Sequence, residues 1–274
     1  MTVREQEKLQ KDLVKSNIFS GFFVKTLTIA ELEARKLKHD PTELITRAIQ
    51  PLLWLLVFGE VFTRIRAIPT GNVSYLDFMA PGILAQSVLF ISIFYGISII
   101  WERDLGIVHK FLASPTPRLS IVLGKALSAS IRGLSQALII YIFSLILGVK
   151  INGNLFDIIG VIAVVIISAI LFSTFSLVIA CIVRTRERFM GIGQLLTMPM
   201  FFASNAIYPI SMMPEWLQII AKLNPLSYEV DALRALMLPN FSSTYPLIID
   251  FAVISLTSAG LVVIGAILYP RVAR

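Results

Sequence analysis

Long apolar runs separated by short polar stretches dominate the hydrophobic pattern of this 274-residue chain. The runs are rich in Leu, Ile, Val and Phe and do not alternate with polar residues, which favours helices over the strands of a membrane barrel. A helix needs about 20 apolar residues to cross the hydrocarbon core of a bilayer. The pattern therefore predicts an all-α integral membrane protein with six transmembrane helices, at residues 44–62, 75–101, 119–147, 156–183, 189–208 and 246–269.

The polar stretch between the second and third predicted spans is amphipathic. Its charged side chains are too many for a bilayer core, yet its apolar side chains recur at helical spacing, at Leu105, Ile107, Val108, Phe111 and Leu112. Pro115 and Pro117 end this helix, because proline cannot continue a helix and restricts the residue before it. A short amphipathic helix docks on a partner or lies on lipid. The alternative interpretation is an ordinary connecting loop.

Two further amphipathic stretches flank the predicted spans. Residues 19–37 mix apolar and basic positions and predict a helix in the membrane interface, with a soluble N-terminal helix as the alternative. Residues 215–223 and 226–237 predict two short helices separated by Asn224-Pro225. This pair is too short to span the bilayer and indicates a re-entrant or interfacial hairpin before the last span.

Composition and charge support a multi-pass membrane protein. The chain is 56% hydrophobic and only 15% charged, whereas a water-soluble domain carries about 25% charged residues. Most Lys and Arg residues fall on the side of the N-terminus, and the other side carries only Arg64, Arg66, Lys150, Lys222 and Arg234. This bias predicts a plasma or inner membrane location with both termini cytoplasmic. It also explains the net charge of +7 without a nucleic-acid partner.

The chain lacks the common sequence motifs of catalysis and nucleotide binding. The sequence contains no phosphate-binding loop, no H-E-x-x-H and no Gly-x-Ser-x-Gly. We predict no catalytic, cofactor-binding or metal-binding residues, so the energy for transport must come from an ion gradient or from another subunit. Arg132 lies within a span with Gln136 one turn later. It either lines a pathway or interface, or it is a structural arginine paired with an acceptor such as Glu60.

Two motifs together resemble those of type-2 ABC exporter permeases, the ABC-2 type, and most closely the daunorubicin-resistance group. The first is ERDLGIVHKFLASPTPR at residues 102–118, followed by Leu123-Gly-Lys125, Arg132 and Gln136. The second is FASNAIYPISMMPEWL at residues 202–217, followed by NPLSYEVDALR at residues 224–234. The resemblance covers essentially the whole chain.

This resemblance implies one transmembrane domain over residues 1–274, in which residues 1–40 form a cytoplasmic tail and interface helix. It implies a homodimeric exporter of drug-like, lipid or glycolipid substrates that binds two ABC ATPase subunits, and those subunits hold the ATP and Mg. Residues 105–112 would be the coupling helix, and residues 215–237 the outer re-entrant pair. The implied ATPase-coupling residues are Glu102, Arg103, Leu105, Gly106, Val108, Phe111, Leu112, Pro115 and Arg118. The implied pathway or interface residues are Arg132, Gln136, Asn205, Pro209, Pro214, Trp216, Asn224 and Pro225.

Two other functional classes remain open from the sequence. An ion-coupled secondary transporter normally carries more buried carboxylates near the bilayer midplane or at broken helices, whereas the acids here cluster near the ends of the spans. A structural or scaffolding membrane protein would share the same apolar composition. A neighbouring reading frame that encodes a phosphate-binding loop would favour the exporter.

Overall fold

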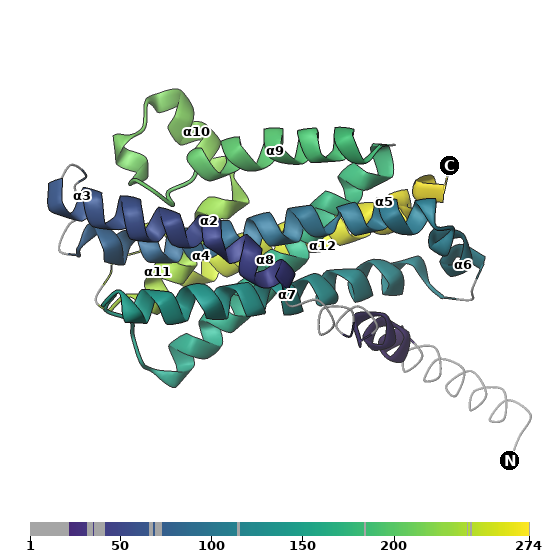
Figure 1. Cartoon of the computed structure of the whole chain (residues 1–274), viewed down its shortest axis with the longest axis horizontal. Helices are drawn as coiled ribbons and strands as arrows, with labels where there is room; N and C mark the ends of the chain where they lie inside the picture. The colour runs from purple at the N-terminus through teal and green to yellow at the C-terminus, as the bar shows by residue number, and fades with distance from the viewer. Residues whose placement is uncertain are drawn as a thin grey trace, which may run out of the picture.

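The protein is a bundle of long helices. The computed structural model describes residues 22–31, 35, 42–65, 68, 73–113, 116–183, 185–239, 241 and 243–273, and every regular element within them is helical. Figure 1 shows the long helices lying side by side along the longest axis, with α6 and the C-terminus at one end and α3 at the other. The predicted all-α class is confirmed. Residues 1–21 and much of 32–41 lie outside the described residues, so most of the predicted tail does too.

The first predicted span is one continuous helix with a π-helical middle. It consists of α2 (Thr42–Leu53), a π-helix (Trp54–Gly59) and α3 (Glu60–Ile65). Pro51 lies just before the π-helix and removes a backbone donor from the ladder, which is a common setting for such an irregularity. Before this span, residues 22–31 form a helix that buries Thr26 and Ile29. Any placement of that helix in the membrane interface stays a prediction.

The second span is the buried centre of the bundle. Its helices α4 (Tyr75–Tyr95) and α5 (Ile97–Asp104) join at Gly96 into a 30-residue segment. In the most apolar part of this segment, 78% of the residues are buried. The Ser74 hydroxyl caps its start by accepting the Asp77 amide at 3.0 Å. After a turn at Leu105 and Gly106 comes α6 (Ile107–Ala113). The helix predicted at residues 105–112 therefore lies at Ile107–Ala113, because Leu105 and Gly106 form the turn that separates it from α5.

Most of the remaining helices pack around α4. The remaining elements are α7 (Arg118–Ile146), α8 (Leu155–Ile182), α9 (Arg186–Phe202), a 3-10 turn (Ile210–Met212), α10 (Glu215–Leu223), α11 (Pro225–Met237), α12 (Leu247–Leu268) and a last 3-10 turn (Tyr269–Ala273). The helices α2, α7, α8, α9 and α11 all pack directly on α4, and α12 packs outside them against α7, α8 and α11. The two short helices predicted before the last span are present as α10 and α11. Their position on the outer side of the membrane, as a re-entrant pair, stays a prediction.

One predicted span has the wrong boundaries. We expected a helix at residues 189–208 preceded by a basic loop, but α9 begins at Arg186, where the Thr185 hydroxyl accepts the Arg188 amide, and ends at Phe202. It is 17 residues long. The described residues contain five helices long and apolar enough to cross a membrane, at 45–65, 75–104, 118–146, 155–182 and 247–272. A sixth crossing through α9 remains a prediction.

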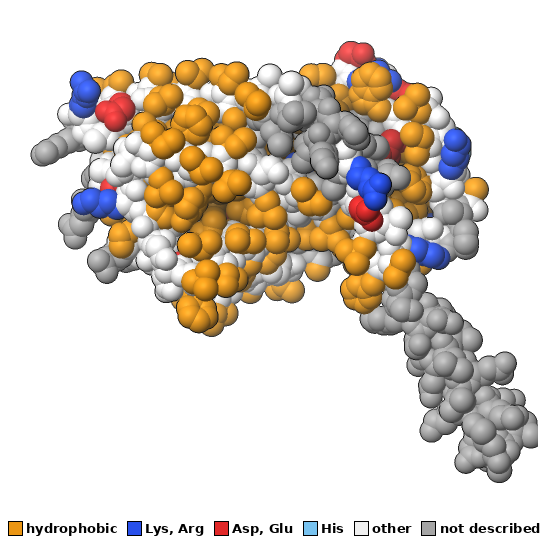
Figure 2. Space-filling view, turned by 60° about the horizontal axis from the view of Figure 1, so that its bottom comes forward, with side chains coloured by type: hydrophobic (Ala, Val, Ile, Leu, Met, Phe, Trp, Pro, Cys, Tyr) orange, Lys and Arg blue, Asp and Glu red, His pale blue; other side chains and the backbone are white. Residues whose placement is uncertain are grey.

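The outside of the bundle is apolar, as a lipid-facing surface requires. Large hydrophobic side chains are exposed along α7, α8 and α12, including Leu138, Phe156, Ile248 and Leu256. Figure 2 shows hydrophobic side chains across the middle of one face and charged side chains gathered toward the ends. The interior holds two buried clusters, a larger one around α4, α8 and α11 and a smaller one beneath α6.

A non-helical segment, residues 203–208, passes through the interior next to α4. Its carbonyls find their partner in Arg234 of α11, whose Nη2 donates to Asn205 O at 2.5 Å and to Ala206 O at 3.1 Å. The same guanidinium donates from Nε to Phe78 O of α4 at 3.0 Å. A single side chain thus fastens α11, the segment 203–208 and α4 together.

Gly82 should be a strict requirement at this contact. A Cβ at position 82 would lie 2.3 Å from the Ala206 carbonyl oxygen and 2.8 Å from its Cα. Because these are backbone atoms, Gly82→Ala must displace α4 or the segment 203–208, at a cost of about 1–3 kcal/mol. We expect a lower melting temperature in detergent. Gly260→Ala in α12, where nothing lies within 4 Å of the added Cβ, is the control and should melt at or above the wild type. Equal melting of the two variants would contradict the prediction.

Candidate functional site

The end of the bundle that carries α6 contains a buried ion pair. Glu102 at the end of α5 is 4% exposed and Lys125 in α7 is 2% exposed, and Lys125 Nζ donates to Glu102 Oε2 at 2.5 Å. The ammonium also lies 5.9 Å from the ring centroid of Phe111 in α6. The pair therefore joins three consecutive helices where the chain reverses direction. Buried charges of opposite sign hold such a geometry because neither tolerates the loss of its partner.

The turn between α5 and α6 depends on a glycine. Gly106 has φ of +70°, a left-handed conformation that is costly for other residues. The turn directs the two faces of α6 differently: Val108 is fully buried in the cluster beneath it, and Phe111 and Leu112 are half-buried against the same cluster. Leu105 in the turn is 68% exposed. The amphipathic prediction is therefore realised as a helix anchored by one face, with an apolar residue presented outward at its start.

Charged side chains surround the base of α6. Asp104 lies 3.1 Å from Arg103 and 2.8 Å from Arg186 of α9, and the Arg186 guanidinium lies 3.5 Å from the Trp101 ring centroid. These contacts tie α9 to the end of α5. Arg118 is exposed at the start of α7, and Pro115 lies outside the described residues. Of the predicted coupling residues that the structure describes, all lie at this end of the bundle.

Arg132 and Gln136 lie deeper, in the middle of α7. Arg132 is 7% exposed, its Nη1 donates to Ser128 Oγ at 3.2 Å, and its guanidinium lies 4.5 Å from the Tyr95 ring centroid. The suggested pairing with Glu60 is wrong, because Glu60 instead lies 3.9 Å from Arg64 within α3. Gln136 is 1% exposed, and neither atom of its amide has a hydrogen-bonding partner among the described residues.

The other predicted pathway residues belong to the opposite end, around α10 and α11. Asn224 donates to Met200 O at 2.6 Å and to Ala203 O at 3.2 Å, and its Oδ1 accepts the Leu226 amide. It caps α11 and holds the end of α9. Pro225 occupies the first turn of α11, Pro214 precedes α10, and Pro209 precedes the 3-10 turn. Asn205 is buried, whereas Trp216 is 63% exposed.

The structure therefore separates the predicted residues into three places. The 30-residue α4–α5 segment, roughly 45 Å long at 1.5 Å per residue, runs between the α6 end and the α10 end. Lys125 was missing from the predicted coupling set. The sequence contained a signal for Lys125, because Glu102 and Lys125 lie on either side of the same polar break, at the ends of two spans. Among the described residues no group of three or more His, Cys, Asp or Glu side chains could hold a metal ion.

Comparison with known proteins gives a consistent result. Transport permease ycf38 of Cyanophora paradoxa is 31% identical to this chain over 224 residues. The match covers 81% of this chain and 77% of the length of the relative. The daunorubicin resistance ABC transporter permease protein DrrB1 of Streptomyces coeruleorubidus is 27% identical over 237 residues, covering 86% and 81%. The multidrug ABC transporter permease YbhR of Escherichia coli is 26% identical over 190 residues, covering 65% and 50%.

The helical bundle with its apolar exterior defines a multi-pass membrane protein, and its relatives are transport permeases. Residues 23–238 match the ABC-2 type transporter family. The chain belongs to this family, as its two motifs indicated, and permeases of the family work with ABC ATPase subunits.

The buried ion pair gives a direct test of how the α6 end is held. Glu102→Gln leaves the Lys125 ammonium buried without its counter-charge, which typically costs about 3–5 kcal/mol. We expect a markedly lower melting temperature in detergent. The double variant Glu102→Gln with Lys125→Met should recover part of the loss, because no uncompensated charge remains.

The matched control is Arg64→Gln, which removes an exposed ion pair with Glu60 and should cost no more than about 1 kcal/mol. The single variant Lys125→Met completes the cycle. If its effect and that of Glu102→Gln simply add in the double variant, the two side chains are not coupled and the prediction is wrong.

Proposed function

We propose that this chain is the membrane-embedded subunit of an ATP-driven exporter. In this proposal two copies of the chain pair with each other and with two separate ABC ATPase subunits, which bind and hydrolyse ATP with Mg. The assembly moves an amphipathic drug-like, lipid or glycolipid substrate out of the cytoplasm or the inner leaflet. The observation that carries the proposal is α6, a short helix anchored by one face at the end of the bundle in a chain of the ABC-2 family.

The charge distribution supports a cytoplasmic position for α6. The helix ends around α6 belong to segments that carry Arg103, Lys110, Arg118, Arg186 and Arg271, whereas α3 and α10, toward the other end in Figure 1, carry Arg64 and Lys222. An excess of Lys and Arg marks the cytoplasmic side of a membrane protein. On this orientation the N- and C-termini are cytoplasmic and the pair α10–α11 faces outward.

The contacts at the α6 end suggest how force enters the membrane. ATP binding would close the ATPase pair and push on α6. Because Phe111 of α6 lies against Lys125, and Lys125 is fixed to Glu102, the push reaches both α7 and the α4–α5 segment. The continuous helix α4–α5 then carries the displacement through the bundle as a rigid element. Substrate would leave between the two copies of the permease.

The docking role of α6 is tested best at Leu105, because this side chain is exposed and its replacement leaves the core intact. Burying a leucine in an interface contributes about 1.5–3 kcal/mol, so Leu105→Asp should weaken ATPase association about 10- to 100-fold. Co-purification with candidate ABC ATPases, followed by titration, measures this. Leu223→Asp, which changes a leucine 79% exposed in α10 at the other end, should bind normally. If the Leu105→Asp variant binds the ATPase as tightly as the wild type, α6 does not dock on the ATPase.

The energy source separates the exporter from an ion-coupled carrier. In vesicles that contain the chain and its ATPase partner, export should continue when an ionophore collapses the proton gradient while ATP is maintained. It should stop when ATP is replaced by a non-hydrolysable analogue. The opposite pattern, or transport by the purified chain alone, would establish the secondary carrier instead.

A further inference from the structure

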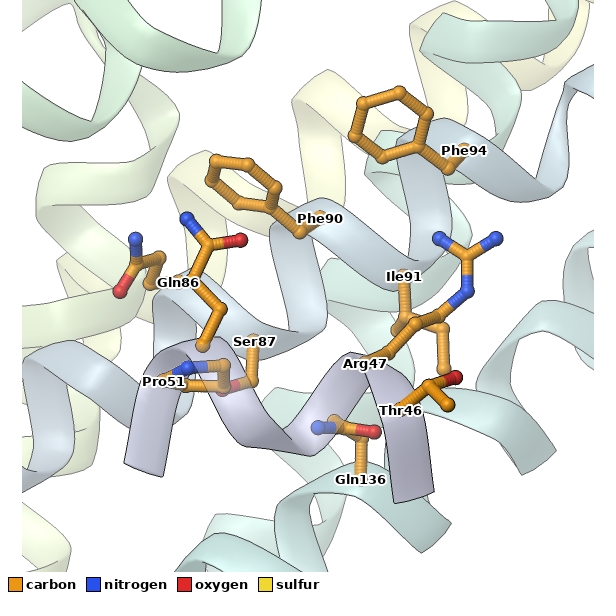
Figure 3. Close-up of a pocket in the computed structure, with 10 residues that line it drawn as sticks. Thr46, Arg47, Pro51, Gln86, Ser87, Phe90, Ile91, Phe94 and Gln136 are labelled. Atoms are coloured by element: carbon orange, nitrogen blue, oxygen red, sulfur yellow. The ribbon is translucent and has the colours of Figure 1, made fainter. Parts of the chain in front are cut away.

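A polar cavity of about 390 Å³ opens between α2, α4 and α7. Gln86, Phe90 and Phe94 of α4 and Gln136 of α7 contribute to its lining. Figure 3 shows Phe90 and Phe94 projecting from the same side of α4. Arg47 of α2 is the one charged lining residue, and its guanidinium lies 5.8 Å from the Phe94 ring centroid. Because Arg47 already interacts within the protein, the neutral lining groups decide which ligand fits.

Two buried amides in the cavity have open hydrogen-bonding atoms. Gln136 is 1% exposed and Gln86 is 3% exposed. Gln86 Oε1 and both amide atoms of Gln136, Oε1 and Nε2, make no hydrogen bond to any described residue. An unpaired polar atom destabilises the interior of a protein, and the surrounding lipid cannot pair with it. The two glutamines therefore indicate that water or a ligand enters the cavity.

The open atoms define the functional group that satisfies them. They are two acceptors, on Gln86 and Gln136, and one donor, on Gln136. A carboxylate or a phosphate diester only accepts hydrogen bonds and can pair only with the donor, whereas an ammonium only donates and can pair only with the acceptors. A hydroxyl both donates and accepts, so a head with several hydroxyls can satisfy all three atoms. The cavity is therefore complementary to an uncharged, polyhydroxylated head.

The aromatic side of the cavity favours a sugar among such heads. The ring centroids of Phe90 and Phe94 lie 6.1 Å apart, and both side chains line the cavity. The face of an aromatic ring is electron-rich, and the C–H groups of a sugar ring pack favourably against it. A cavity with a few convergent polar groups among aromatic side chains is typical of a site for a small organic ligand.

The amides lie in the middle of the bundle. At 1.5 Å per residue, Gln86 is roughly 17 Å along the α4–α5 segment from Tyr75 and roughly 27 Å from Asp104. A lipid that stays in the bilayer keeps its polar head at the membrane surface, because a polar group in hydrocarbon is costly. A polar head bound at this depth therefore belongs to a molecule that is crossing the membrane.

An apolar groove continues from the cavity along α2. Thr46 and Gln50 are exposed and line both, and the groove is otherwise lined by Ile49, Leu53, Trp54, Val57 and Phe58. It holds about 520 Å³, and the side chains of Ile49, Leu53 and Val57 are each more than half exposed. A polar cavity that leads into an exposed apolar groove is complementary to a polar head joined to a hydrocarbon tail.

We propose that the cavity binds the uncharged sugar head of a glycolipid, while the acyl chain of that glycolipid lies along the groove of α2. Gln86 and Gln136 hydrogen-bond the hydroxyls, and Phe90 and Phe94 pack against the sugar ring. This inference rests on the proposed export function, for which it selects the substrate class. Amphiphiles whose head is a bare anion or cation leave at least one amide atom unpaired and bind less well.

Photolabelling of the purified full chain tests the site without the ATPase. The chain is placed in phosphatidylcholine vesicles with a small fraction of a glucosyl diacylglycerol that carries a photoreactive acyl chain, and the labelled peptides are mapped by mass spectrometry. Two comparison probes carry the same acyl chain on phosphatidylcholine and on anionic phosphatidylmethanol, whose heads contain no hydroxyl. We expect the glucosyl probe to label residues 49–58 about tenfold more than either, which corresponds to one or two net hydrogen bonds. Equal labelling by the three probes, or stronger labelling by phosphatidylmethanol, would overturn the proposal.

Variants at the two amides locate the selectivity. Gln136→Met removes both open atoms of that residue with little change in volume, and it should reduce glucosyl labelling about tenfold. Gln86→Met should reduce it several-fold. The matched control is Gln194→Met in α9, which changes an exposed glutamine outside the cavity and should label like the wild type. Wild-type labelling by folded Gln136→Met or Gln86→Met would contradict the assignment, because that amide would then bind only water.

Melting in detergent separates an amide that binds a ligand from one that holds the bundle together. Without glycolipid, Gln136→Met should melt at or above the temperature of the wild type, because the lost amide pairs with no described residue. An excess of glucosyl diacylglycerol should raise the melting temperature of the wild type and not that of the variant. If Gln136→Met is strongly destabilised, the amide is structural and its role in binding is refuted.

Two further arms identify the source of the ligand. An excess of methyl glucoside, a head without a tail, should leave labelling unchanged, and full competition would show a soluble sugar and overturn the glycolipid. Protection of residues 49–58 from all three probes would assign the groove to a second copy of the chain and overturn the proposal. Unselective labelling with intact ATPase binding refutes only this inference, whereas absent ATPase binding with selective labelling refutes only the exporter.

Discussion

Backbone polar groups inside a membrane protein must find partners within the protein, and this requirement shapes the bundle most strongly where the chain is not helical. Residues 203–208 leave the helical ladder in the interior, and lipid cannot satisfy their carbonyls. Arg234 supplies three donors to carbonyls of this segment and of α4. Asn224 does the same for the end of α9. The irregular segment is therefore stable only because α11 packs beside it, and Gly82 is the residue that permits the close approach.

The α6 end meets the same requirement with charge. Glu102 and Lys125 are each almost fully buried, so each is stable only in the presence of the other. Between this pair and the Arg234 contacts runs α4–α5, which is buried along most of its length. The structure thus connects the exposed residue Leu105 with the contacts around α11 through one long buried segment, in which α4 and α5 meet at Gly96.

The sequence predicted the elements better than their limits and their contacts. Apolar runs longer than a bilayer core identify α4, α7, α8 and α12 regardless of how they pack, because lipid selects for them directly. The start of α9 could not be found this way, since Arg186 and Arg188 look like a loop until the Thr185 cap is seen. The partner of Glu102 lies 23 positions away on another helix. The sequence indicates this pairing only through an acid and a base on either side of one polar break, and the contact itself depends on how α5 and α7 pack.

The interior does not meet this requirement everywhere: among the described residues, Gln86, Gln136 and Asp250 each keep a buried side-chain atom without a hydrogen-bonding partner. Elsewhere in the interior, Arg234 and Asn224 show that the fold can pair demanding side chains with backbone when stability requires it. Buried polar atoms without partners cost free energy, and more so at membrane depth, where lipid offers no hydrogen bonds. Such groups are retained where water or a bound molecule satisfies them.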